Sequence, residues 1–328
     1  MTIRNLDKLF APKSIALFGA SDKEGSVGKT VTDNLFNGGF EGPIWLVNPK
    51  HKEINGHQCY RNTKHLPEAP DLAIIATPPK FVPDLIADLG DKGTKSALVI
   101  TAGFRQQNLT QKMLDASNPH CLRIVGPNCM GIMIPKIGLN ASFAHSMPLK
   151  GDLAFISQSG AMISAVLDWA TGKDIGFSSM VSIGNMSDVD LGDILDYLAG
   201  DNETRAILMY LEHVTDARKF MSAARSAACV KPVIVIKAGR HAEAAKAAHS
   251  HTGALAGSDA VYNTAFHRAG ILRVLDLEDL FDAAETLNRL KPITGDRLAI
   301  VTNGGGAGVL AVDRLIDFGD SLAATVRS

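Results

Sequence analysis

The sequence has few cysteines and lacks any long apolar run. Its cysteines, Cys59, Cys121, Cys129 and Cys229, are scattered, and no two of them have the C-x-x-C spacing. This argues against both a disulfide framework and a zinc site, and it fits a reducing compartment, so we expect a cytoplasmic protein. Roughly 18 consecutive apolar residues, the length of a membrane span, occur nowhere, so we expect no contact with a membrane.

An excess of either charge is also missing. The 33 basic and 34 acidic residues nearly balance, which leaves a formal net charge of -1. A basic field that would attract a nucleic-acid backbone is therefore not expected, and neither is a nucleic-acid partner. Aromatic residues make up only 6%, whereas 46% of the chain is apolar. That composition suits buried parallel strands covered by helices.

What the chain does have is a regular alternation of short apolar runs with stretches of helical periodicity. This alternation predicts the parallel sheets of an α/β fold. The first set of runs predicts a doubly wound domain over residues 1–148, with strands at 14–20, 44–48, 72–77, 96–101 and 122–126. The second set predicts an α/β domain of flavodoxin-like size over residues 149–292, with strands at 152–160, 176–184, 206–212, 232–240 and 270–274.

A third unit begins near residue 293. The segment RLAIVTNGGGAGVLAVDRLIDFG (297–319) repeats the strand, glycine-rich turn and helix of residues 153–170. One such unit cannot bury both of its faces alone. We therefore expect residues 293–328 to be the start of a further domain.

A glycine-rich turn, GASDKEGSVGKT (19–30), follows the first predicted strand and opens the first helix. Such a turn is where backbone N–H groups and a helix dipole receive a phosphate. The Walker A spacing fails because Lys23 stands where a glycine is needed, and the G-x-G-x-x-G pattern fails at Ser21. A phosphate-bearing nucleotide ligand is favoured by the location, and a merely flexible turn is the alternative. Polar or proline-containing turns end the later strands at the same edge, at 47–50, 76–79, 101–104 and 126–131.

Two more helix starts could hold an anion. FISQSGAM (155–162) and TNGGGAG (302–308) each follow a predicted strand. Facing one phosphoryl group, they would stabilise it from both sides. The first also resembles a nucleophile elbow, but the elbow needs glycine where this chain has Ser157, so a serine hydrolase is not expected. Cys129 has no neighbouring base, and we expect a small packed residue there rather than a nucleophile.

The stretch AAHSHTGALAGSD (247–259) carries two histidines between small residues and has no strand pattern. A loop imidazole can act as a nucleophile toward phosphate, and a solvated loop histidine is the alternative. A metal site is not expected because no third ligand is at a suitable spacing. Glu212 ends the apolar run AILMYLE, where a carboxylate can orient a histidine or act as its base. An edge residue paired with Arg205 or Arg218 is the alternative for Glu212.

Taken together and in order, these motifs resemble one family. PKSIALFGAS, VGPNCMGIM, LAFISQSGAM and SHTGALAGSD, with Arg240 and TNGGGAGV on either side of the last, are similar to nucleoside-diphosphate-forming acyl-CoA synthetases of the succinyl-CoA synthetase type, particularly the ADP-forming acetyl-CoA synthetases. The resemblance implies a Rossmann-like CoA-binding domain followed by flavodoxin-like domains. It also implies a reaction in which acyl-CoA, phosphate and ADP give the acid, CoA and ATP by way of an acyl phosphate and a phosphohistidine.

The resemblance assigns roles to residues of this chain. It makes His251, rather than His249, the phosphoryl acceptor and Glu212 its support. The residues implied to contact CoA are Gly19, Ser21, Gly25, Ser26, Gly28, Lys50, Thr77, Pro78, Thr101 and Asn128. Those implied to hold phosphate are Ser157, Gln158, Ser159 and Gly160 at one helix start, and Asn303, Gly304, Gly305 and Gly306 at the other.

The same resemblance implies partners. Its members use an ATP-grasp domain, which the 328 residues do not contain, so we expect a partner subunit or a C-terminal domain to supply it. ADP or ATP, with Mg, would bind only there, and the chain itself would take acyl-CoA, acyl phosphate and phosphate. An oligomeric assembly is expected.

Two other readings remain. GLNASF (138–143) and DARKFMSAARSA (216–227) are similar to the synthetase-like, CoA-sensing region of bacterial protein lysine acetyltransferases, which carry a fused GNAT domain. Enteric members of that group lack the loop histidine, whereas here SHTGALAG is intact. An NAD(P)-dependent oxidoreductase would need an acidic residue after the second strand, where this chain has Asn48 and Lys50.

Overall fold

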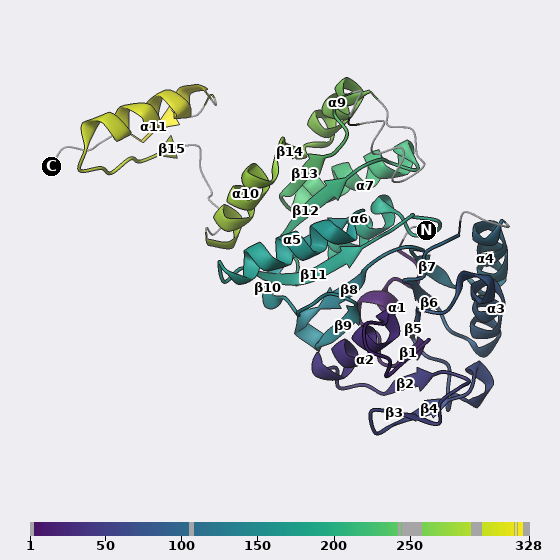
Figure 1. The fold of residues 1–328 in the computed structure, drawn as a ribbon. Helices are drawn as coiled ribbons and strands as arrows, with labels where there is room; N and C mark the ends of the chain where they lie inside the picture. Colours follow the sequence, from purple (N-terminus) through teal and green to yellow (C-terminus); the bar gives the residue numbers. More distant parts are fainter. Residues whose placement is uncertain are drawn as a thin grey trace. The chain divides into compact units, whose positions relative to one another are not determined.

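The computed structural model describes residues 3–104, 108–241, 244, 258–289, 297–317, 319 and 321–323. The chain forms two compact units, Met1–Asn288 and Arg289–Ser328 (Figure 1). Each is described by itself below. The first two domains expected from the sequence therefore lie within one compact unit.

The first sheet of the larger unit is doubly wound. Its strand order is β3-β4-β2-β1-β5-β6-β7, and every neighbouring pair is parallel except β3 with β4. The strands are β1 (Ile15–Phe18), β2 (Ile44–Val47), β3 (Glu53–Ile54), β4 (His57–Tyr60), β5 (Leu72–Ile75), β6 (Ser96–Val99) and β7 (Arg123–Val125). The helices are α1 (Asp7–Phe10), α2 (Val27–Asn37), α3 (Val82–Lys92) and α4 (Leu109–Ser117), with 3-10 turns at Thr63–His65, Pro79–Phe81 and Asn118–His120.

Strand β1 is buried on both faces because its alternate residues pack against different layers. Ile15 and Leu17 join a hydrophobic cluster that includes Val31 of α2. Ala16 and Phe18 join another that includes the α3 side of the sheet. This explains the uninterrupted apolar run in the sequence. The strand order reverses between β1 and β5, and in such sheets ligands bind outside the carboxyl ends of the strands at that point.

The second sheet has the order β14-β13-β12-β10-β11-β8-β9. It contains β8 (Gly131–Ile134), β9 (Leu139–Ser142), β10 (Leu149–Ser157), β11 (Gly176–Ser182), β12 (Ala206–Leu211), β13 (Val233–Lys237) and β14 (Leu272–Val274). Its helices are α5 (Gly160–Thr171), α6 (Leu191–Gly200), α7 (Ala217–Val230), α9 (Asp259–Ala269) and α10 (Leu277–Arg289), and a 3-10 turn at Pro135–Ile137 joins β8 to β9. The fold class predicted from the sequence, α/β with two largely parallel sheets, is confirmed.

The second sheet includes two strands from before the boundary expected near residue 148. Strands β8 and β9 precede that residue, yet β8 pairs antiparallel with β11, with Met133 opposite Met180. Helix α2 of the first layer holds β9 in place, because Asn34 Nδ2 donates to the carbonyl oxygens of Ser142 and Ala144, each at 2.8 Å. Residues before 148 therefore complete the second sheet.

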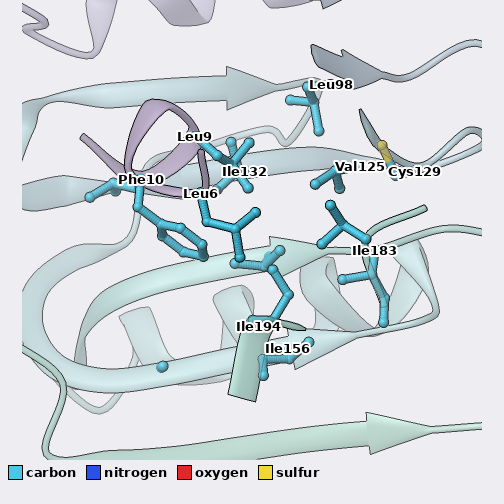
Figure 2. Close-up of a cluster of buried hydrophobic side chains, with 14 of the residues drawn as sticks. Leu6, Leu9, Phe10, Leu98, Val125, Cys129, Ile132, Ile156, Ile183 and Ile194 are labelled. Atoms are coloured by element: carbon cyan, nitrogen blue, oxygen red, sulfur yellow. The ribbon is translucent and has the colours of Figure 1, made fainter. Parts of the chain in front are cut away.

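One hydrophobic cluster spans both sheets (Figure 2). Leu98 and Val125 come from the first sheet, and Ile132, Ile156 and Ile183 come from the second sheet or the turn after β11. Leu6, Leu9 and Phe10, from α1 and the residue before it, belong to the same cluster. Because these side chains share one core, the two sheets form a single cooperative body.

A buried ion network also joins the two sheets, and it gives a stability prediction. Arg123 of β7 places Nε 3.1 Å from Asp188 Oδ2 and Nη2 3.0 Å from Asp193 Oδ2. The Asp193 side chain is only 1% exposed and also pairs with Lys219, at 2.6 Å. Replacing Arg123 with Met should lower the free energy of unfolding by about 3 kcal/mol, because it leaves a buried carboxylate with one cation fewer. Urea unfolding monitored by fluorescence measures this change.

The matched control is Arg225→Met, at an exposed arginine on α7. That change should alter the free energy of unfolding by no more than about 0.5 kcal/mol. Equal, small effects of the two substitutions would show that the network contributes nothing to stability.

The smaller unit contains β15 (Arg297–Leu298), α11 (Gly305–Asp317) and β16 (Ser321–Leu322). Strands β15 and β16 are parallel. Several of its apolar side chains are exposed, including Val301 at 97% and Leu310 at 72%. That the unit is the start of a second flavodoxin-like domain stays a prediction. Across all the described ranges, no helix has both the length and the apolar character needed to cross a membrane.

Candidate functional site

Two adjoining pockets lie in the larger unit. The β1 pocket, of about 710 Å³, opens at the carboxyl ends of β1, β2 and β5. The α5 pocket, of about 520 Å³, reaches the start of α5. Both are lined by Val27, Ala76, Thr77 and Pro78, so the two pockets adjoin, and together they are called the cleft below.

The CoA residues predicted from the sequence gather along this cleft, with one exception. The β1 pocket is lined by Gly19, Ser21, Ser26, Gly28 and Lys50. Thr77 and Pro78 line both pockets, and Thr101 and Asn128 line the α5 pocket. Gly25 lines neither pocket; it has φ +73° in the turn that leads to α2.

Two glycines allow the turn after β1 to approach its neighbours closely. A Cβ on Gly28, the second residue of α2, would lie 2.1 Å from the carbonyl oxygen of Gly19. Gly19 has φ +92°, and a Cβ there would lie 2.7 Å from the carbonyl oxygen of Ala76. Ser26 caps the helix, since its Oγ accepts a hydrogen bond from the Lys29 N–H at 3.2 Å. The first turn of α2 therefore presents its backbone donors at the floor of the β1 pocket.

Arg61, which was not among the residues predicted from the sequence, also lines the β1 pocket. Two cations, Lys50 and Arg61, and two carboxylates, Asp84 and Asp88, line this pocket. The two cations suit the phosphates of a ligand. Arg61 directly follows β4, a strand that was not predicted. The signal that could have revealed it is Asn55-Gly56, the two-residue turn between β3 and β4, in which both residues have positive φ.

The α5 pocket has a different character. None of its described lining residues is charged, and much of its wall is apolar, including Ile100, Met130 and Phe143. At its end, Ser159 is the N-cap of α5 without a side-chain hydrogen bond to the helix. Ser157 shapes this turn, because its Oγ donates to the Ser159 carbonyl oxygen at 2.7 Å and accepts from the Ser159 N–H at 3.0 Å. The pocket thus combines an apolar wall with a helix start whose first N–H groups can receive an anion.

Gln158 lies in this turn and lines the α5 pocket, and its side chain bonds to the chain just after β12. Its side-chain oxygen accepts hydrogen bonds from the backbone N–H groups of Glu212 and His213, the second at 3.0 Å. Its backbone N–H donates to the Tyr210 carbonyl oxygen at 3.3 Å. The phosphate-binding role that the resemblance implied for Gln158 stays a prediction.

Glu212 lies just beyond the carboxyl end of β12 and is 6% exposed. The alternative pairing with Arg205 is not formed, because Arg205 Nε instead lies 2.6 Å from Asp152 Oδ2. Two basic groups surround this strand end. Burial lowers the pKa of Lys237, against the opposing effect of Asp259. Burial and then the charge of Lys237 lower the pKa of His213. Glu212 acts in the opposite direction to burial and raises the pKa of Lys237, so its charge is felt by that lysine.

His249 and His251 lie outside the described residues. The elements on either side of them meet the edge of the sheet where Glu212 lies. Ala238, which follows β13, donates its N–H to the carbonyl oxygen of Leu211 at 2.8 Å. On α9, the Tyr262 hydroxyl accepts a hydrogen bond from the Val214 N–H at 3.3 Å. Ala238 and Tyr262 are therefore bonded to residues that lie within two positions of Glu212 in the chain.

The second predicted phosphate-binding helix start lies in the smaller unit. Gly305 and Gly306 begin α11, and Asn303 and Gly304 precede them.

Cys129 lines the α5 pocket, and burial raises the pKa of its thiol to about 12. Its Sγ donates to the Val99 carbonyl oxygen at 3.3 Å. It is therefore a packed neutral thiol and not a nucleophile. No group of three His, Cys, Asp or Glu side chains suited to a metal occurs within the parts of the chain that the structure describes.

Comparison with known proteins agrees with this arrangement. A CoA binding domain model matches residues 13–135, and a model of the succinyl-CoA ligase like flavodoxin domain matches residues 150–287. The chain is 43% identical over 318 residues to the alpha subunit of acetate–CoA ligase (ADP-forming) I of Pyrococcus furiosus, and the match covers 94% of this chain and 69% of that subunit. The chain belongs to the ADP-forming acetate–CoA ligase family. A second ligase of this family, acetate–CoA ligase (ADP-forming) I of Archaeoglobus fulgidus, is 45% identical over 323 residues.

The match to the Archaeoglobus ligase covers 97% of this chain but 47% of that protein, so the chain spans about half the length of this relative. Among solved structures, acetyl-coenzyme A synthetase 1 of Ca. Korarchaeum cryptofilum, in complex with phosphate and ADP, superposes with a TM-score of 0.92 at 39% identity. That match covers 98% of this chain and 70% of the other. These ligases lend no support to the alternative of a lysine acetyltransferase region.

Proposed function

We propose that this chain is the CoA-binding and phosphohistidine-bearing part of an ADP-forming acyl-CoA synthetase, with acetyl-CoA as its acyl-CoA. The reaction converts acyl-CoA, phosphate and ADP to the acid, CoA and ATP. The observation that carries the proposal is the pair of adjoining pockets, one lined by the helix start of α2 and the other by the helix start of α5. A helix start in each pocket supports a ligand that has phosphates at one end and a thioester, next to a bound phosphate, at the other.

CoA would bind along this cleft in one direction. Its phosphates suit the β1 pocket, where Lys50, Arg61 and the first turn of α2 supply positive charge and N–H donors. Its extended arm would pass Thr77 and Pro78, the strip that both pockets share. The thioester would then reach the uncharged α5 pocket.

Phosphate held at the start of α5 would attack the thioester carbonyl carbon. A C–O bond forms, the C–S bond breaks, and CoA leaves as the thiolate, which gives the acyl phosphate. The N–H groups at the start of α5 are placed to stabilise the negative charge of the phosphate during this step.

The second step would involve His251 and Glu212. An imidazole nitrogen attacks the phosphorus atom, the P–O bond to the acyl group breaks, and the carboxylate leaves as the free acid. Glu212 would hold the proton on the other ring nitrogen, as a buried carboxylate at a strand end can. The phosphohistidine would then pass its phosphoryl group to ADP on an ATP-grasp partner subunit or domain, which would also hold Mg.

The first step can be tested without nucleotide. We expect the protein to release free CoA from acetyl-CoA only when phosphate is present, measured as thiol with a chromogenic disulfide, with acetyl phosphate trapped as its hydroxamate. Sulfate in place of phosphate is the control and should give no thiol. If acetyl-CoA binds but phosphate releases no CoA, the proposed synthetase chemistry is wrong.

A further inference from the structure

The side chain of Gln158 is 8% exposed and all of its hydrogen-bonding groups are used within the protein. Its oxygen accepts from the backbone N–H groups of Glu212 and His213. Its nitrogen donates to the His213 carbonyl oxygen at 3.0 Å and lies 3.6 Å from the sulfur of Met186. A primary amide has two donors and one oxygen with two lone pairs. These partners fill that capacity, so no side-chain donor is left for an anion.

The groups that Gln158 binds lie just past the end of the sheet ladder. Strand β12 makes its last pair with β10 at Tyr210 and its last pair with β13 at Leu211. Glu212 and His213 directly follow β12 in the chain. The Gln158 amide supplies both the acceptor and the donor that a neighbouring strand would have given. It therefore continues the pairing by one side chain, from the turn that begins α5.

We propose that Gln158 is a positioning residue that fixes Glu212 relative to the start of α5. This inference rests on the proposed function, in which the phosphoryl group lies at the start of α5 and Glu212 supports the histidine that attacks it. Gln158 connects the two parts of the site directly. Its backbone belongs to the turn before α5, and its side chain bonds to the backbone of Glu212, just after β12. Displacement of a reacting group by 1 Å can cost about a hundredfold in rate.

The test compares two substitutions of Gln158. Their expected effects differ according to whether Gln158 binds the anion or positions Glu212. Gln158→Met keeps the length of the side chain and removes the whole amide. Gln158→Glu keeps the oxygen that accepts from the two N–H groups but adds a negative charge. The readout is the labelling of the protein by radioactive acetyl phosphate in rapid-quench experiments, which gives a saturated rate constant and a half-saturating concentration.

A positioning residue predicts that the saturated rate constant falls about a hundredfold in Gln158→Met and by less in Gln158→Glu. The half-saturating acetyl phosphate concentration and the Kd of CoA should change by less than about threefold, since uniform binding is unaffected when only alignment is lost. The matched control is Gln111→Met, because Gln111 is an exposed glutamine of α4 that bonds only to Asp115 among the described residues. It should behave as the wild type does.

Three results would overturn the inference. One is an unchanged saturated rate constant in Gln158→Met, and another is a loss confined to the half-saturating concentration. The third is a slower reaction for Gln158→Glu than for Gln158→Met, which is the order expected if Gln158 contacts the anion directly. If Gln158→Met does not fold, the Glu variant decides the question by whether its rate constant or its half-saturating concentration changes. Absence of label in the wild type would instead contradict the proposed function itself.

Discussion

Replacement of His251 by alanine is expected to abolish phosphate incorporation from radioactive acetyl phosphate. The proposed function gives this imidazole the role of covalent acceptor, and loss of a nucleophile removes the step entirely rather than slowing it. Glu212 is buried just after the end of β12, and the proposed function gives it the role of supporting one ring nitrogen. The label in the wild type should be acid-labile and stable to base, as a phosphohistidine is, and it is measured by filter binding and by mass spectrometry of the modified peptide.

His249 provides the control, since it lies two positions away in the same segment. His249→Ala should retain label at no less than about half of the wild-type level, because a group outside the reacting geometry adds little to the step. If His251→Ala is still labelled, and His249→Ala is not, the two roles are reversed. Label on a carboxylate, recognised by its lability to hydroxylamine, would contradict a histidine acceptor altogether.

Gly28→Ala should weaken CoA binding by at least about a hundredfold and lower the free energy of unfolding by about 3 kcal/mol, as overpacking against fixed atoms does. The added Cβ would lie 2.1 Å from the carbonyl oxygen of Gly19, and this neighbour is backbone and cannot rotate away. The start of α2 must then move off the end of β1, and it would carry the N–H donors of the β1 pocket with it. Isothermal titration with CoA and urea unfolding measure the two effects.

Gly200→Ala is the matched control. Gly200 ends α6, and a Cβ there would meet no atom within 4 Å. Its CoA affinity should equal that of the wild type, and its free energy of unfolding should be equal or higher by up to about 1 kcal/mol, because alanine restricts the unfolded chain. Wild-type CoA binding by Gly28→Ala would show that the close approach of Gly28 to Gly19 does not shape the site.

The parts of the fold that were predictable are those in which the local pattern and the tertiary environment agree. The segments IALF (15–18) and LAII (72–75) are apolar throughout because β1 and β5 are buried on both faces. The same logic predicted that the turns after these strands would converge, since parallel strands end at one edge of a sheet. Gly19 and Thr77 do line the same pocket.

What could not be predicted depends on pairing between distant segments. Strands β8 and β9 are short, and nothing in their periodicity indicates that Met133 lies opposite Met180 in the second sheet. The direction of the Gln158 amide is of the same kind. Its partner Glu212 lies 54 residues further along the chain. A sequence motif identifies the turn, but the use of each donor in it is decided by the strand end that packs beside it.

Strands β8 and β9 belong to the second sheet although they come before the expected domain boundary. This limits where the chain can be cut to build chimaeras with a related protein. A cut after residue 135, where the match to the CoA binding domain ends, falls between β8 and β9. In a chimaera built at that point, the two strands of one antiparallel hairpin would come from different proteins. The hydrogen bond from Asn34 to Ser142 would then also join residues from different proteins. The two sheets should therefore be treated as one exchangeable unit. Experiments that transfer acyl specificity between proteins should exchange residues 3–289 as one piece.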